Sequence, residues 1–276
     1  MSYFGVKKIN ENVHFAGGLP NITRQTYINM WTEAKNRNYT DFYQTLCDDF
    51  DVNIMKSKEE LDKIALNTQI QIKKVSKMLY LHGFVLYAAL RKYIKDHPDI
   101  HHINIVETGT AKGFSALCMA KALDDCNQAG TIYTLDILPN NVSMYWNCIC
   151  DFDGKNTRPE LLKPWKSIVD KYIVFKTGDT KKLLPSLNLE RIHFSFLDAH
   201  HDYPYLSYEM NWVKQFQQKG DIIICDDYTI YNNGRLQFPG ITKAIDEFIS
   251  KKEYDHKIYW GDDGQKKRGY VWFKYL

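Results

Sequence analysis

The chain has 276 residues, and its 36 lysine and arginine residues against 33 aspartate and glutamate residues give a formal net charge of +3. This near balance excludes a dedicated nucleic-acid-binding protein, whose surface would carry a dominant basic stripe. Apolar residues make up 44% and charged residues 25%, which is typical of a soluble globular protein with room for one α/β domain or two small ones.

The sequence shows no signal for membrane insertion or export. Residues 1–5 lack the apolar core of a signal peptide, and the longest apolar stretch, residues 83–90, is too short to cross a bilayer. We therefore expect no membrane span and a cytoplasmic location. The six cysteines form no C-x-x-C motif, as expected of reduced thiols. Cys148 and Cys150 resemble a metal or redox pair, but no second pair completes a zinc set.

The first part of the chain is polar and aromatic. Short helical patterns cover residues 26–36 and 40–50. We interpret residues 1–57 as an N-terminal extension that serves as a lid, a dimer arm or a partner site, so a homo-oligomer is one expectation. Residues 58–276 then form the main domain. It opens with one or two helices that begin after Ser57, run up to Pro98 and are broken at Gly83.

Strand and helix patterns alternate from residue 103 onward. Strands are expected over residues 103–106, 131–135, 172–176, 192–197 and 221–225, and helices over residues 114–123, 181–187, 205–217 and 241–250. Alternation of this kind predicts a parallel sheet with helices on both faces. Two further β-rich runs, 254–260 and 268–275, predict an antiparallel hairpin. The expected fold is α/β: a doubly wound, mostly parallel, seven-stranded sheet with an antiparallel C-terminal hairpin and an N-terminal helical extension.

The first expected strand leads into a glycine turn. It ends at Glu107, Gly109 and Gly113 follow, and a helical pattern starts at Phe114. Glycine lets the backbone approach a ligand, a helix start offers free N–H groups, and a carboxylate accepts from an ammonium or hydroxyl group. The spacing E-x-G-x-x-x-G differs from the G-x-G-x-x-G of dinucleotide binders, so the ligand need not carry a pyrophosphate. A simple tight turn is the alternative.

Carboxylates follow four of the expected strands: Glu107, Asp136, Asp198, and the adjacent Asp226 and Asp227. The carboxyl ends of parallel strands share one edge of the sheet, where ligands bind. Clustered carboxylates repel one another unless cations or hydrogen-bond donors meet them. Asp136 can accept the hydroxyls of a ribose or cap a helix. Asp198, Asp226 and Asp227 together offer three oxygen ligands, which suit Mg²⁺ or Ca²⁺.

Two histidines accompany the acidic strand ends. His200 and His201 follow Asp198 by two and three residues, on a loop that faces the expected crevice. A neutral imidazole within reach of a metal-bound hydroxyl is a suitable general base near pH 7. We therefore expect His201, His200 and Asp198 to be the catalytic residues.

Five short motifs lie at these strand ends and follow one another along the chain. They are E-T-G-T-A-K-G-F-S at 107–115, T-L-D-I at 134–137, T-G-D-T at 177–180, L-D-A-H-H-D-Y at 197–203 and G-D-I-I-I-C-D-D-Y at 220–228. Together they resemble the class I S-adenosylmethionine-dependent methyltransferases, of the metal-dependent type that includes catechol O-methyltransferase and the macrocin-type sugar O-methyltransferases. The resemblance runs from about residue 79 to the C-terminus and leaves residues 1–57 uncovered. It is specific for fold and cofactor, and much less so for the substrate.

The resemblance implies S-adenosylmethionine as the cofactor. It implies the following cofactor-binding residues: Glu107, Gly109, Thr110, Ala111, Gly113, Phe114 and Ser115 at the methionine part, Asp136 at the ribose, Gly178, Asp179 and Thr180 beside the adenine, and Asp198 at the shared edge. It also implies Asp198, Asp226 and Asp227 as ligands of a divalent metal, with Mg²⁺ as the first choice. His201 falls where catechol-type enzymes carry a lysine base, and His200 where some sugar enzymes carry an acidic base.

The expected function is transfer of a methyl group from S-adenosylmethionine to a hydroxyl of a small-molecule or carbohydrate acceptor. Residues on the loops above the site are candidates for the acceptor pocket: Tyr203, Tyr205, Tyr228, Tyr231 and Arg235. Two alternatives stay open at this point. One is a metal-dependent hydroxylase on the same fold, which needs a redox metal and an oxidant. The other is a non-catalytic nucleoside-binding protein.

Overall fold

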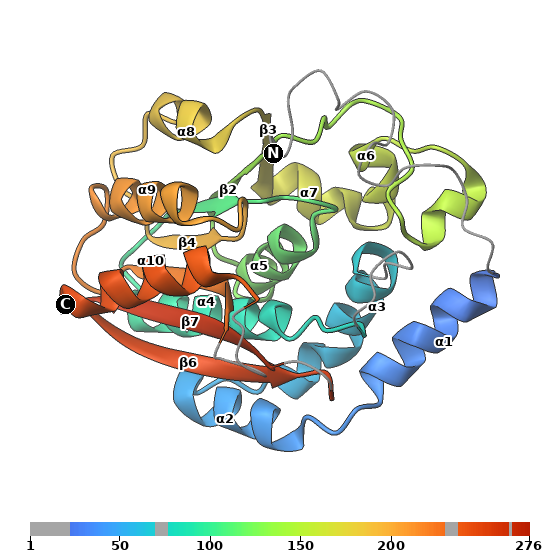
Figure 1. Cartoon of the computed structure of the whole chain (residues 1–276), viewed down its shortest axis with the longest axis horizontal. Coiled ribbons are helices and arrows are strands. Elements are labelled where there is room, and N and C mark those ends of the chain that lie inside the picture. The colour runs from blue at the N-terminus through green and yellow to red at the C-terminus, as the bar shows by residue number, and fades with distance from the viewer. Residues whose placement is uncertain (1–22, 70–76, 230–236, 265–266) are drawn as a thin grey trace.

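The computed structural model describes residues 23–69, 77–229, 237–264 and 267–276. Within them, a seven-stranded sheet has the order β3-β2-β1-β4-β5-β7-β6 (Figure 1). Its strands are β1 (Ile103–Thr108), β2 (Gly130–Asp136), β3 (Ile173–Thr177), β4 (Phe194–Leu197), β5 (Ile222–Tyr228), β6 (Tyr254–Asp262) and β7 (Lys267–Tyr275). β1 to β5 pair in parallel, whereas β7 is antiparallel to both β5 and β6. The predicted fold class and the C-terminal hairpin are confirmed.

The chain order reverses across the middle of the sheet. Strands run outward from β1 through β2 to β3 on one side, and through β4 to β5 on the other. Thr108, the last residue of β1, pairs with both Leu135 of β2 and Leu197 of β4. Ligands bind in open α/β sheets outside the carboxyl ends of the strands at such a switch point. The segments that follow Thr108 and Leu197 therefore line the expected crevice.

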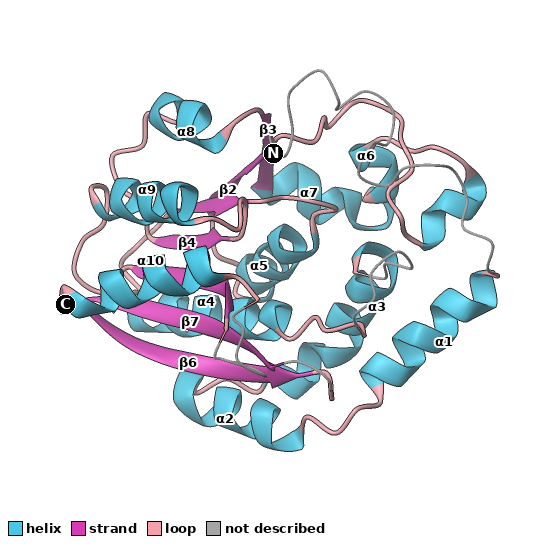
Figure 2. Ribbon diagram, viewed as in Figure 1, coloured by secondary structure: helices cyan, strands magenta, loops and turns pink. Residues whose placement is uncertain are grey.

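Helices cover both faces of the sheet (Figure 2). They are α1 (Arg24–Lys35), α2 (Thr40–Phe50), α3 (Lys58–Thr68), α4 (His82–Asp96), α5 (Phe114–Asp125), α6 (Arg158–Leu161), α7 (Lys166–Tyr172), α8 (Thr180–Leu183), α9 (Tyr203–Lys214) and α10 (Pro239–Ser250). Residues on opposite faces of β1 enter separate cores: Ile105 packs with the α4–α5 side, and Val106 with the α9–α10 side. None of the described helices is long and apolar enough to span a bilayer.

The described part of the N-terminal extension packs on the main core. Tyr27 of α1 and Leu46 of α2 are fully buried in the same apolar cluster as Phe84 of α4. α2 also contacts the edge strand β6, where the Phe50 and Tyr259 rings lie 5.4 Å apart. Whether this extension serves as a lid, a dimer arm or a partner site stays a prediction.

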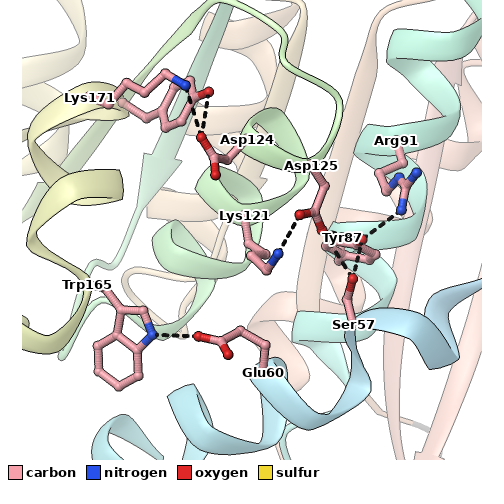
Figure 3. Close-up of polar contacts among 10 residues, drawn as sticks. Ser57, Glu60, Tyr87, Arg91, Lys121, Asp124, Asp125, Trp165 and Lys171 are labelled. Carbon is pink, nitrogen blue, oxygen red and sulfur yellow. Dashed lines mark hydrogen bonds and ion pairs between the residues drawn. The ribbon is translucent and has the colours of Figure 1, made fainter.

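A polar network ties the segment before α3 to the central helices (Figure 3). The hydroxyl of Tyr87 on α4 donates to the Asp125 carboxylate at 2.7 Å and accepts from Arg91 at 2.8 Å. Ser57 reaches both Tyr87, at 2.6 Å, and Asp125, at 3.1 Å. Each of these polar groups therefore has a partner where α3, α4 and α5 meet.

The predicted helix break at Gly83 is wrong. Gly83 lies inside the first turn of α4, which begins at His82, while α3 ends at Thr68. A Cβ at Gly83 would lie 2.5 Å from Cζ of Phe114 on α5. This glycine therefore permits close packing of two helices and does not interrupt one.

Candidate active site at the carboxyl edge of the sheet

The glycine turn after β1 touches the end of β4. Gly109 has a φ of +91°, and a Cβ there would lie 2.1 Å from the backbone oxygen of Asp198. Gly113 has a φ of +90°, and a Cβ there would lie 3.0 Å from Leu162. Both glycines are therefore explained by backbone conformation and close packing, and the turn brings the predicted cofactor segment against the first acid of the predicted metal site.

Hydrogen bonds to the Glu107 side chain stabilise this turn. Its carboxylate is fully buried and accepts hydrogen bonds from the hydroxyls of Ser115 on α5 and Thr134 on β2. Burial raises the pKa of Glu107 to about 7, against the opposing effect of the two hydroxyls. Thr110 lies 2.5 Å from the Thr134 hydroxyl and joins the same network.

Asp136 organises the backbone around the turn. Its carboxylate oxygens accept from the amide of Ala111 at 2.5 Å and from the amide of Leu138 at 2.8 Å. The buried Arg158 lies 3.9 Å away and donates to the Ala111 carbonyl at 3.0 Å. Each carboxylate oxygen has a second lone pair, so Asp136 can still accept from a ligand hydroxyl. Phe114, in contrast, packs in the core, with its ring 5.0 Å from that of His82.

Further polar side chains meet after β3, at the start of α8. Asp179 caps α8 through the Lys181 amide at 2.9 Å and accepts from the Tyr205 hydroxyl at 2.7 Å. Glu209 of α9 is buried and accepts from Thr180 at 2.6 Å and from Thr108 at 2.8 Å. Burial raises the pKa of Glu209 to about 7. This side chain thus connects the end of β1 to the start of α8.

Asp198, His201 and Asp227 meet at the same edge. The Nε2 atom of His201 lies 3.0 Å from Asp227 Oδ2 and 3.4 Å from Asp198 Oδ1. One potential ligand atom from each of the three residues lies within 4.8 Å of the other two. Asp227 adopts a φ of +61° where the pairing of β5 with β7 is irregular, between Cys225 and Tyr228.

Asp226 has different surroundings. Its Oδ1 accepts from the amide of Asp227 at 2.6 Å, and its Oδ2 lies 3.4 Å from Arg268 of β7. Arg268 also pairs with Asp227, with Nε 2.9 Å from Oδ1. The structure therefore brings Asp198 and Asp227 together with a histidine, and it turns the third predicted ligand toward an arginine.

Charge in this cluster is strongly coupled. Burial and the charge of Asp226 raise the pKa of Asp198 to about 6. Burial alone would lower the pKa of His201, but the hydrogen bond to Asp198 and the charges of the acids outweigh it and raise the pKa to about 9. His201 and Arg268 are therefore the cations that the acids meet in the structure itself.

The other predicted residues are spread over the neighbouring surface. The His200 ring stacks on Tyr205 at 4.6 Å, and its Nδ1 lies 3.2 Å from Asp202. Tyr203 donates to Glu247 at 2.6 Å and Tyr228 donates to Asp246 at 3.0 Å, so both hydroxyls are bound to α10. Tyr231 and Arg235 lie outside the described residues.

Three side chains that contact the predicted residues at the carboxyl edge of the sheet were not predicted from the sequence. Arg268 comes from the hairpin, and its role requires knowing that β7 pairs with β5. Phe238 places its ring 4.7 Å from that of His201. Glu209 gave a usable signal, because it shares a helical spacing with Leu206, Met210 and Val213, all of which are buried.

Residues 106–228 match a family model described as a methyltransferase domain. No curated protein sequence matches the chain. Among solved structures, the O-methyltransferase from Bacillus cereus in complex with SAH is 14% identical, with a TM-score of 0.53 over 92% of this chain and 100% of that one. The O-methyltransferase TomG from Streptomyces achromogenes in complex with SAM is 13% identical, with a TM-score of 0.53 over 92% and 99%. Cofactor-bound Rv0187 from MTB is 15% identical, with a TM-score of 0.54 over 80% and 88%.

The structural similarities agree with the mostly parallel sheet and the antiparallel hairpin described above. The matched segment contains the glycine turn, Asp136, Asp198 and the Asp226–Asp227 pair. The chain therefore has the fold of these O-methyltransferase structures, and its residues 106–228 match the methyltransferase domain model.

Proposed function

We propose that the protein transfers a methyl group from S-adenosylmethionine to a hydroxyl oxygen of a small-molecule or carbohydrate acceptor. The observation that carries this proposal is the contact between the two halves of the site. The glycine turn at Gly109 lies directly against Asp198, which belongs to the cluster with His201 and Asp227. A cofactor on the turn and an acceptor at the cluster would therefore be neighbours.

The cofactor half of the proposal rests on the residues around β1 and β2. Asp136 keeps free lone pairs for ribose hydroxyls, and the turn from Thr110 to Gly113 passes beside it. The Bacillus cereus and Streptomyces achromogenes proteins, which have the same fold, were solved with SAH and SAM respectively. We assign the methionine part of the cofactor to the turn, and the adenine to the corner at Asp179.

The donor atoms present fit a divalent metal. Asp198, His201 and Asp227 would hold it, since their ligand atoms already converge, while Arg268 occupies the other oxygen of Asp227. Asp226 would support the site without binding the ion. One nitrogen and two carboxylate oxygens suit Mn²⁺ or Zn²⁺ as well as the Mg²⁺ expected from carboxylates alone. A bound ion would lower the pKa of an acceptor hydroxyl and orient it.

The protein's own residues supply alignment and a proton acceptor. The sulfonium methyl is already activated, so holding the acceptor oxygen in line provides much of the acceleration. His201 faces two carboxylates and is one of the proposed metal ligands. We therefore assign the role of general base to His200, whose ring stacks on Tyr205 and lies beside Asp202. A histidine in this position accepts the proton as the oxygen–methyl bond forms. Phe238 provides an apolar wall beside His201.

The acceptor we favour is a sugar or glycan hydroxyl, with a catechol second. Two adjacent hydroxyls suit a chelating metal site in either case. The test is turnover of S-adenosylmethionine with panels of sugars, sugar nucleotides and catechols, each with and without added Mg²⁺, Mn²⁺ or Zn²⁺. Formation of methylated product that falls on addition of a chelator supports the proposal. Metal-independent methylation, unchanged when Asp198 and Asp227 are both replaced by alanine, would contradict the metal assignment.

A further inference from the structure

A second group of potential metal ligands lies outside the acidic edge. Cys148, Cys150 and Asp151 each place one ligand atom within 4.8 Å of the other two. Cys148 is the N-cap of the 3-10 helix Ile149–Asp153, which contains Cys150 and Asp151. The sequence offered no second cysteine pair for a zinc set, but the structure adds a carboxylate to the first pair.

The local backbone holds these three groups together. Asp151 accepts from the amides of Trp146 at 2.8 Å and Cys148 at 3.1 Å, while the Cys148 sulfur accepts from the Asp151 amide. The Cys150 sulfur lies 3.0 Å from the Cys148 sulfur and 3.8 Å from Asp151 Oδ1. Cys148 and Asp151 are buried, whereas Cys150 is half-buried and gives access from solvent.

Tyr27 of α1 points to a missing ligand at this cluster. Its side chain is 0% exposed, and its hydroxyl has no hydrogen-bond partner within the described part of the chain. The Tyr27 ring lies 5.4 Å from that of Phe152, the residue after Asp151, and α1 contacts the 3-10 helix that contains both. Burial, followed by the charges of Asp151, Cys148 and Cys150, raises the pKa of the Tyr27 hydroxyl. The adjacent Asn147 also buries an Oδ1 atom without a hydrogen bond. Unpartnered buried polar atoms of this kind often mark an unseen water or ion.

The charges around this cluster would be balanced by a divalent cation that binds in exchange for the two thiol protons. The hydrogen bond with Cys148 and burial raise the pKa of Cys150, and burial raises the pKa of Asp151, while the positive charge of the buried Lys112 opposes both rises. Two thiolates and one carboxylate carry three negative charges, which a divalent cation and one ammonium group balance. With both thiols protonated, Asp151 and Lys112 balance each other instead. Exchange of two protons for the cation therefore leaves the buried cluster neutral, as buried charges require.

We propose that Cys148, Cys150 and Asp151 bind a thiophilic divalent cation of the zinc class, with a water in the fourth position that contacts the Tyr27 hydroxyl. Zinc binds thiolate sulfur at about 2.3 Å in tetrahedral geometry, so its two sulfurs lie roughly 3.7 Å apart. The sulfurs here must separate by less than about 1 Å to reach this spacing, which rotation of the half-buried Cys150 side chain supplies. The ion would link the 144–156 segment to α1.

The experiment uses Co²⁺ as the probe, added to the reduced full-length protein. Cobalt bound to thiolates gives a near-ultraviolet charge-transfer absorption that carboxylate and imidazole ligands do not give. We expect this band, its loss on addition of Zn²⁺, and protection of two thiols from alkylation by Zn²⁺. Cys150→Ser, at the half-buried position, should abolish the band, and Tyr27→Phe should weaken binding by about tenfold or more.

Matched variants separate this site from the acidic edge. Cys126→Ser replaces another half-buried cysteine and should leave the band unchanged, as should Asp198→Ala. Absence of the band, together with equal alkylation with and without Zn²⁺, would overturn the proposal. So would a band that persists unchanged in Cys150→Ser. Neither result depends on methyl transfer.

Discussion

The backbone oxygen of Asp198 lies 2.1 Å from the point where a Cβ would begin at Gly109. This contact joins the end of β4 to the turn after β1, and it fixes the distance between the two halves of the proposed site. The absence of a side chain at residue 109 is therefore a geometric requirement of the site.

Replacing Gly109 by alanine should disrupt both stability and cofactor binding. The left-handed backbone alone costs about 1–2 kcal/mol, and relief of the clash must displace Asp198. We expect a lower unfolding midpoint and a loss of S-adenosylmethionine affinity of about tenfold or more, measured by thermal unfolding and calorimetry. Gly264→Ala is the matched control, because Gly264 has a φ of +84° with nothing within 4 Å of its Cβ position. Equal effects in the two variants would show that the contact is unimportant.

The three aspartates should not be equivalent. Asp198→Asn and Asp227→Asn each remove the negative charge of a carboxylate in the converging set and should lower kcat by about 100-fold or more. Asp226→Asn should lower kcat by about tenfold or less, as expected of a supporting residue. Turnover and Mn²⁺ affinity for the three variants provide the measurement. A larger loss with Asp226→Asn than with Asp227→Asn would restore the ligand set expected from the sequence.

Arg268 should contribute to stability through the acids that it neutralises. Its side chain is 27% exposed and pairs with both Asp226 and Asp227. Arg268→Met removes the cation that faces Asp226 and leaves Asp227 with His201 alone, and it should cost about 3–5 kcal/mol in urea unfolding. Arg268→Lys should recover part of that loss. In the Arg268→Met background, Asp226→Asn should be neutral or stabilising, and strictly additive effects would argue against the ion pair.

Glu209 should make stability depend on pH. Its pKa is about 7 in the folded protein, against about 4.3 for an exposed glutamate. The folded state thus holds the proton more tightly, and this contribution is present below about pH 4.3 and lost as pH rises through about 7. We expect the stability of the wild type relative to Glu209→Gln to fall by on the order of 3 kcal/mol across that range.

Urea unfolding at a series of pH values checks this difference. Glu190→Gln, which changes an exposed glutamate, is the control and should follow the wild type. Parallel curves for the wild type and Glu209→Gln would mean that Glu209 does not titrate between the two pKa values. Glu107 titrates in a similar range in both proteins and therefore cancels in the comparison.

Much of the fold followed from the sequence, because strand and helix patterns alternate and acidic residues mark the strand ends. The helix break expected at Gly83 is wrong, since a glycine that allows helix packing has the same sequence signal as one that ends a helix. The roles of the adjacent Asp226 and Asp227 depend on an irregularity between Cys225 and Tyr228, where β5 pairs with β7. The two paired strands are far apart in the sequence. The sequence around Asp226 and Asp227 therefore does not show which way each side chain points, nor that Arg268 contacts them.

We infer that the edge of the sheet at Gly109 and Asp136 binds S-adenosylmethionine. Calorimetric titration of S-adenosylmethionine into the purified protein, with added Mg²⁺ or Mn²⁺ and then with EDTA, is the decisive measurement. We predict binding in both conditions, since Asp198 is the only proposed cofactor residue that is also a metal donor, and binding weaker by about tenfold or more in Gly109→Ala. No binding in either condition would contradict the methyltransferase assignment and leave the crevice to another ligand.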